Sequence, residues 1–178
     1  MKPAIAALGF ALVCAAPLHA QTEAASTTAA NALPAVDREF VQAASSGSST
    51  EIDASKLAMR NTENKDVRAF ARHMVIDHTK LAIALKLAAP HGVTVPKDNS
   101  DTSILDSLRP LRGKAFDQAY AQKIGLDGHR QAIHEFQKEI TDGQNDSLTN
   151  AAQKALPTIE AHYRMAQSLA QEVGVQQQ

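Results

Sequence analysis

Apolar residues recur at alternating steps of three and four along four stretches of the chain, the spacing that lines one face of an α-helix. The pattern predicts helices over about 34–61, 64–89, 113–141 and 145–173. Asn64 is placed to cap the second helix and Gly174 to end the fourth. The positions expected to face the interior are Phe40, Ala44, Gly47, Glu51, Ala54 and Ala58; Val67, Ala71, Met74, His78, Leu81, Leu85 and Ala88; Ala115, Ala119, Gln122, Leu126, His129, Ile133, Phe136 and Ile140; and Leu148, Ala152, Ala155, Ile159, His162, Ala166, Leu169 and Val173.

The connections between these helices differ in length. The first and second helices, like the third and fourth, are joined by a few residues, so each pair is expected to be antiparallel. Residues 90–112 form a longer central connection, in which PHGVTVPKDNSD is typical of a loop and SILDSLRPL can hold a short helix. This connection either spans the helices end to end or folds back at one end. The sequence therefore predicts an all-α protein, an antiparallel four-helix bundle with a longer central connection.

The first twenty residues, MKPAIAALGFALVCAAPLHA, are typical of a bacterial secretory signal cleaved after Ala20. Lys2 precedes an apolar run over 4–16, which is shorter than the roughly 20 residues of a membrane-spanning helix. A lipid-modified Cys14 is the alternative, and the bulk of Val13 before it disfavours that reading. We expect a signal peptide at 1–20, a disordered linker at 21–33, the helical domain at 34–174 and a tail at 175–178. The protein is then periplasmic or exported, with no transmembrane segment after cleavage.

Composition and charge narrow the functions further. After cleavage the chain has 17 basic and 19 acidic residues, a net charge near −2, which gives no argument for nucleic acid as a partner. No cysteine remains, so disulfide and thiolate chemistry are excluded. The sequence also lacks a glycine-rich phosphate loop and a serine nucleophile motif. It does not identify a protein partner.

Each predicted helix carries one ionisable residue on its apolar face: Glu51, His78, His129 and His162. Each lies near the middle of its helix, roughly 17–27 Å from the nearer hairpin loop at 1.5 Å per residue. All four therefore come close to one level whichever way the second pair runs. Three imidazoles and one carboxylate can hold a single transition-metal ion, with zinc, copper and iron as candidates.

Two further carboxylates and one alternative accompany this metal hypothesis. Asp77, next to His78, and Glu160, two residues before His162, are expected to accept hydrogen bonds that orient the rings. His73 and Asp77, one helical turn apart, can instead form a pair on the flank of their helix. The alternative to a metal is a buried hydrogen-bond network in which Glu51 accepts from the histidines.

Several segments together resemble a known bacterial family of exported, ferritin-like domains of unknown function, whose members are often labelled outer-membrane proteins. The segments are EIDASKLA (51–58), VRAFARHMVIDHTK (67–80), FDQAYAQ (116–122), HRQAIHEF (129–136) and LPTIEAH (156–162). The resemblance implies a ferritin-like four-helix bundle in the cell envelope and brings no known activity. The chain has no sign of a membrane barrel or a spanning helix that would support the outer-membrane label.

The chain departs from di-iron ferritin-like proteins, which use Glu-x-x-His pairs. The residues three before His78, His129 and His162 are Val75, Leu126 and Ile159, so a carboxylate-bridged di-iron centre is not expected. The sequence favours a non-enzymatic exported bundle that either binds one metal ion through these residues or holds them as a polar network in its core. An envelope stress or interaction protein with a purely structural Glu/His network is the second hypothesis, and an oxidoreductase with an open metal position is the third.

Overall fold

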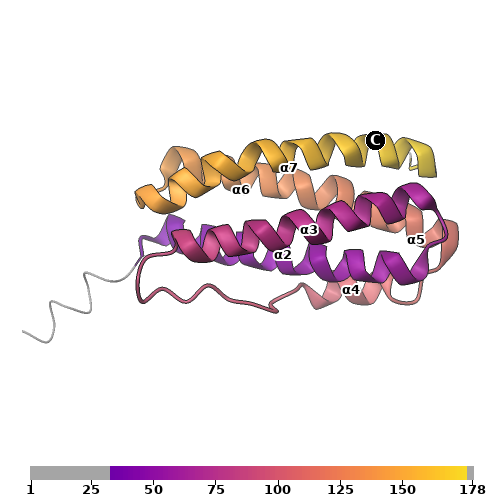
Figure 1. The fold of residues 1–178 in the computed structure, drawn as a ribbon, viewed down its shortest axis with the longest axis horizontal. Coiled ribbons are helices and arrows are strands. Elements are labelled where there is room, and N and C mark those ends of the chain that lie inside the picture. The colour runs from indigo at the N-terminus through magenta and orange to yellow at the C-terminus, as the bar shows by residue number, and fades with distance from the viewer. Residues whose placement is uncertain (1–32, 176–178) are drawn as a thin grey trace, which may run out of the picture. The chain divides into compact units, whose positions relative to one another are not determined.

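The computed structural model describes residues 33–175, and all regular secondary structure in this range is helical (Figure 1). The predicted signal peptide, nearly all of the linker and most of the tail lie outside the described residues. Within the described range, no helix has both the length and the apolar character needed to cross a bilayer. The prediction of an all-α protein is confirmed.

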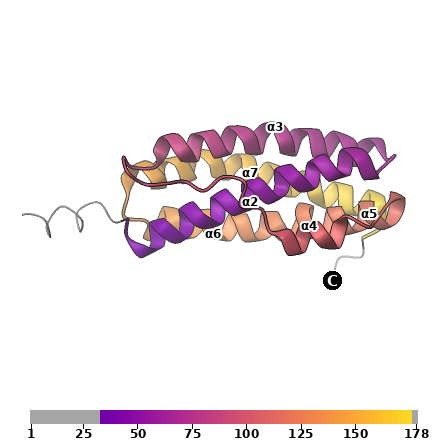
Figure 2. The same ribbon diagram turned by 90° about the horizontal axis from the view of Figure 1, so that it is seen from below.

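Three long helices and one interrupted helical segment lie alongside one another (Figures 1 and 2). The uninterrupted helices are α2 (Ala35–Asn61), α3 (Lys65–Ala88) and α7 (Asp146–Val173). The interrupted segment consists of α5 (Gly113–Tyr120), the π-helix η1 (Ala121–Gly128) and α6 (His129–Asp142). A short helix, α4 (Thr102–Leu108), lies in the central connection, where the sequence predicts one.

The predicted helix boundaries are set by local chemistry. Asn64 caps α3, because its Oδ1 accepts hydrogen bonds from Asp66 N at 2.8 Å and Val67 N at 3.3 Å. Asn145 caps α7 in the same way through Leu148 N at 3.2 Å. Gly174 ends α7 with φ of 79°, a left-handed conformation that glycine adopts without steric cost.

The central connection runs along α2 and so decides between the two routes left open by the sequence. Ser45 Oγ donates to Pro96 O at 2.5 Å, Asp101 N donates to Thr50 Oγ1 at 2.8 Å, and Asn61 Nδ2 donates to Leu111 O at 3.1 Å. Successive residues of the connection therefore bond successively later turns of α2. As a result, α5 begins at the end where α2 stops and α3 starts (Figure 1).

The interior is divided into two apolar clusters by a polar layer. One cluster gathers residues such as Ala54, Met74, Leu126 and Ala166, and the other Ala44, Leu85, Phe136 and Ile159. Along every long helical segment the chain passes from one cluster to the other, and the polar residue lies at the crossing. The members of this polar layer are Glu51, His78, His129 and His162, each at most 4% exposed.

The predicted interior positions are wrong in two places, one in the first helix and one in the third helical segment. Gly47 is exposed and Ser48 is buried in its place, because the steps from Ala44 to Glu51 are four then three rather than three then four. In the third segment Ala115 is exposed and Gln122 only half-buried.

The predicted continuous α-helix over 113–141 contains eight π-helical residues, and these explain the second error. A π-helix closes i→i+5 hydrogen bonds and takes up more residues per turn than an α-helix. The apolar face before it is therefore displaced by one residue, and Phe116 and Tyr120 are buried instead of Ala115 and Ala119.

Candidate metal centre

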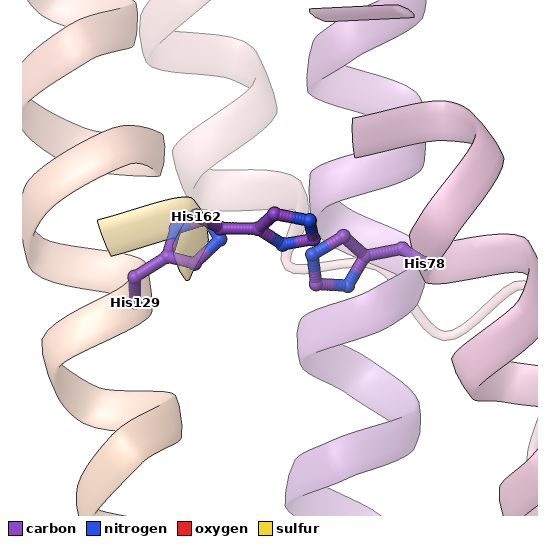
Figure 3. A group of neighbouring side chains, drawn as sticks. All are labelled: His78, His129 and His162. Carbon is purple, nitrogen blue, oxygen red and sulfur yellow. The ribbon is translucent and has the colours of Figure 1, made fainter. Parts of the chain in front are cut away.

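The three buried histidines of the polar layer point toward one another from α3, α6 and α7 (Figure 3). Their ring centroids are 5.3 Å apart for His78 and His162, 5.4 Å for His129 and His162, and 5.7 Å for His78 and His129. One potential ligand atom from each ring lies within 4.8 Å of the others. The three histidines, whose places on their helices were predicted from spacing alone, therefore come together in the interior.

Glu51 of α2 lies beside two of the three histidines and is not itself a member of the group whose ligand atoms lie within 4.8 Å of one another. Its Oε2 lies 2.5 Å from His78 Nε2 and 3.5 Å from His129 Nε2. The 2.5 Å contact pairs Glu51 with His78, whereas His129 Nε2 and His162 Nδ1 remain buried without a hydrogen-bond partner. Leaving such a group unpaired costs about 1–3 kcal/mol in a folded protein. The centre therefore gathers polar atoms that its own side chains do not satisfy.

Oxygen acceptors outside the group fix the protonation of two rings. His129 Nδ1 lies 3.0 Å from Ile124 O, and His162 Nε2 lies 3.2 Å from Asp77 Oδ2. Because a carbonyl and a carboxylate only accept, these two nitrogens carry the hydrogen in a neutral ring. The opposite nitrogens, His129 Nε2 and His162 Nδ1, then present lone pairs, and both are buried without a partner. Metal-binding histidines have this arrangement.

The electrostatics of the group favour an ionised Glu51 and a neutral His162. Burial by itself raises the pKa of Glu51, but the positive charges of His129 and His78 outweigh burial and lower that pKa to about 2. Burial, followed by the neighbouring charge of His78, lowers the pKa of His162 to about 4, although Asp77 opposes the shift. Near neutral pH the group therefore has an ionised carboxylate and a neutral imidazole, the forms in which both bind metals.

The π-helix η1 positions His129 and brings its acceptor into place. Ile124 and His129 are five residues apart, and the carbonyl of the first accepts from the ring of the second. Gly125 lets η1 approach α7 closely, since a Cβ there would lie 2.9 Å from the Cβ of Ala166. Gly128 faces Glu51, whose Oε1 would lie 3.4 Å from an added Cβ. The π-helix was not predicted from the sequence, where its only signal is two glycines within a helical pattern.

Of the two carboxylates predicted to orient the rings, Asp77 contacts a histidine on another helix. Asp77 Oδ2 accepts from His162 across the helix interface, and Asp77 Oδ1 pairs with Lys80 at 2.9 Å. Glu160 is half-buried, and no hydrogen bond or ion pair in the described range joins it to the three histidines. Successive residues of an α-helix point about 100° apart, so a carboxylate next to a histidine in sequence faces away from that ring. The predicted pair of His73 and Asp77 does not form. His73 is exposed, and the two carboxylate oxygens of Asp77 accept from Lys80 and His162 instead.

The distances are compatible with a single ion after a small closure. A tetrahedral ion with nitrogen ligands at about 2.0–2.1 Å places its ligand atoms about 3.3 Å apart. The histidine atoms lie within 4.8 Å of one another, so the rings would have to approach by about 1.5 Å at most. Motion of this size is within the range of side-chain adjustment at a binding site.

The chain is similar to one family of known sequences and to solved structures. A family model described as a domain of unknown function, DUF4142, matches residues 22–169. Among solved structures, the crystal structure of a DUF305 protein from Streptomyces coelicolor, described as secreted, has a TM-score of 0.66 and 18% identity. The similarity covers 80% of this chain and 95% of that one, and at this identity it concerns the fold alone. Comparison with curated proteins gives no match.

Proposed function

This chain belongs to the DUF4142 family of domains of unknown function, and we propose that it is an exported, non-enzymatic metal-binding protein. In this proposal the long helices form a ferritin-like four-helix bundle that holds one transition-metal ion through Glu51, His78, His129 and His162. The secretory pattern of residues 1–20 and the likeness to a protein described as secreted support export. The end-to-end central connection supports the ferritin-like arrangement.

The observation that carries the metal proposal is the pair of fixed tautomers. In their neutral forms, His129 and His162 each donate an N–H to an oxygen outside the group and have a buried lone pair inside it. A hydrogen-bond network would require a donor for each inward lone pair, and Glu51, an acceptor, provides none when ionised. A bound cation accepts all of these lone pairs at once. Neutral imidazoles with one carboxylate suit zinc, copper(II) or iron(II).

A purely structural network is the second candidate, and the close contact of Glu51 with His78 favours it. A protonated His78 beside Glu51 at 2.5 Å would form a buried ion pair without any metal. The protein would then act through its surface as an envelope interaction protein. His129→Leu leaves both partners of this pair in place, so this candidate predicts that the variant folds and keeps its surface function.

Metal titration of tag-free protein distinguishes the two candidates. Chelator-treated protein is titrated with zinc, copper(II) or iron(II), and bound metal is quantified by calorimetry and elemental analysis. We expect one ion per chain and a rise in the melting temperature, since metal at 100 times its Kd contributes about 2.7 kcal/mol to stability. His129→Leu should abolish stoichiometric binding. The matched control, His134→Leu, changes an exposed histidine of the same helix and should bind as the wild type does.

The opposite results would leave the network candidate. No stoichiometric metal after incubation with any of the three ions, together with no change of melting temperature on adding chelator, would refute the metal proposal. Equal binding by His129→Leu and wild type would place the ion elsewhere on the chain.

A further inference from the structure

A cavity of about 180 Å³ lies beside the polar layer, between α2, α4, η1 and α6. Its inner wall includes Glu51 and His78, which are 4% and 3% exposed. Its outer wall includes residues with high exposure, Gly47 on α2 and Lys123 on η1 among them. The cavity therefore connects the surface of the protein with one side of the histidine group.

On the other sides of the group, packing buries His129 and His162, and the half-buried Asp77 contacts His162. His129 is fully buried, with the ring of Phe70 at a centroid distance of 6.3 Å, and His162 is 2% exposed. Gly125 and Ala166 bring η1 and α7 too close together for anything to pass between them at that point. A solute that reaches the group by way of this cavity meets Glu51 and His78 first. These two side chains contact each other through Glu51 Oε2 and His78 Nε2, which lie 2.5 Å apart.

The charges on the cavity wall favour cations. Three carboxylates line it, those of Glu51, Asp101 and Glu135, against the single ammonium of Lys123. Asp101 is already occupied as the cap of α4, where its Oδ1 accepts from two backbone N–H groups. Glu135 is half-buried and lies on the wall contributed by α6. Carboxylates in a cleft with apolar walls concentrate counter-ions and raise their rate of association.

We propose that this cavity is the passage by which a hydrated divalent cation reaches the histidine group, with Glu135 attracting the ion and Gly47 keeping the entrance open. The proposal rests on the metal-binding function, since the group is the destination of the ion. The 180 Å³ is the space open to the centres of water molecules, and one water needs only about 10–15 Å³ in this measure, so the cavity has room for a cation with several of its water ligands. A Cβ added at Gly47 meets no atom within 4 Å, so a larger side chain there would extend into open space at the entrance.

Stopped-flow measurement of cobalt(II) uptake by the chelator-treated full chain tests the passage. Cobalt(II) is followed by its visible absorption, which changes when it exchanges water for imidazole ligands. Gly47→Phe should slow uptake at least tenfold while the final stoichiometry stays at one. Gly47→Ala, the matched control, adds only a methyl group and should load at the wild-type rate.

Charge variants test the same passage without adding bulk. Glu135→Gln should slow uptake about two- to fivefold, and Lys123→Gln should accelerate it by a similar factor, as expected for removing one steering charge. Both effects should shrink at 1 M salt, where the screening length is about 3 Å. These substitutions alter residues that are at least partly exposed, so they keep the test valid even where Gly47→Phe reduces stability.

Rate and stoichiometry separate the two proposals. Full stoichiometry in every variant with the wild-type rate throughout would overturn the passage and leave the metal centre standing. The absence of bound cobalt(II), zinc or copper(II) in the wild type would overturn both. Slowed uptake in Gly47→Phe and Glu135→Gln, with accelerated uptake in Lys123→Gln, supports the passage.

Discussion

A buried acid pair outside the histidine group makes the stability of the protein sensitive to pH near neutrality. Glu139 on α6 and Asp37 on α2 are both 0% exposed. Asp37 Oδ1 accepts from Gln144 N at 2.9 Å and Asn145 N at 3.3 Å, which ties α2 to the loop between α6 and α7. Burial, and then the neighbouring charge of Asp37, raise the pKa of Glu139 from 4.5 to about 7.

The direction of the effect follows from where the proton is held. Between pH 4.5 and 7 the folded protein keeps a proton on Glu139 that the unfolded chain releases. Stability is therefore fully present below pH 4.5 and is lost as the pH rises to about 7. A tenfold change in proton affinity is worth about 1.36 kcal/mol, so the difference between the two pKa values corresponds to at most about 3 kcal/mol.

Glu139→Gln removes this dependence while keeping a side chain that can donate to Asp37. Urea unfolding is measured at pH 5, 6, 7 and 8 for wild type and variant. The free energy of unfolding of the variant should exceed that of the wild type by an amount that grows with pH, by up to about 3 kcal/mol. The lowered pKa of His162 acts in the opposite direction between about pH 4 and 6.5, but it is common to both proteins and cancels in the difference.

The control is Glu172→Gln, which changes an exposed glutamate at the end of α7. Its free energy of unfolding should change with pH as that of the wild type does. A Glu139→Gln curve that also runs parallel to the wild type would show that the Glu139 carboxyl loses its proton at the same pH whether the chain is folded or unfolded. In that case burial and the charge of Asp37 do not raise the pKa of Glu139 in the folded protein.

Three smaller perturbations test other contacts. Gly125→Ala should lower the free energy of unfolding by about 1–3 kcal/mol, because the added methyl group overlaps Ala166. Adding Ala166→Gly should restore part of this loss. Equal stability of Gly125→Ala and wild type in urea would contradict the close approach of η1 and α7. Asn64→Ala should cost about 1 kcal/mol in the same assay by removing the cap of α3. Asp77→Asn should weaken zinc binding about 10–100-fold in calorimetry with little change in stability without metal, and unchanged affinity would show that its contact with His162 does not support the ion.

The convergence of the polar residues could be predicted from sequence because the rise per residue of an α-helix is constant. A polar residue on an apolar face keeps its height at 1.5 Å per residue, and four such residues near the middle of four segments must share a level. His78 and His162 lie at interior positions that the pattern predicted, and Glu51 does also. Helix existence, capping at Asn64 and termination at Gly174 were equally local and therefore predictable.

The remaining features depend on contacts between segments, which a single-helix pattern does not contain. Steps of three and four describe an α-helix and cannot reveal a π-helix. Because of the π-helix, the residues that are buried over 113–122 lie one position later than predicted. Gly47 and Ser48 are both compatible with the spacing, and packing against the neighbouring helices decides between them. Asp77 contacts His162 on α7 rather than the adjacent His78, because proximity in sequence does not mean the same helix face.

The polar layer has a physical consequence for how this protein is stabilised. Glu51 and the three histidines occupy positions where apolar residues would give one continuous interior. They divide that interior into two clusters, and some of their buried atoms have no hydrogen-bond partner. Each unpaired group opposes folding by about 1–3 kcal/mol, so the layer is a source of instability in the metal-free chain. On the proposed function a bound ion removes that penalty, and stability and metal occupancy become linked through mass action. The same lone pairs that weaken the metal-free protein would therefore supply its selectivity for a cation that accepts imidazole nitrogen.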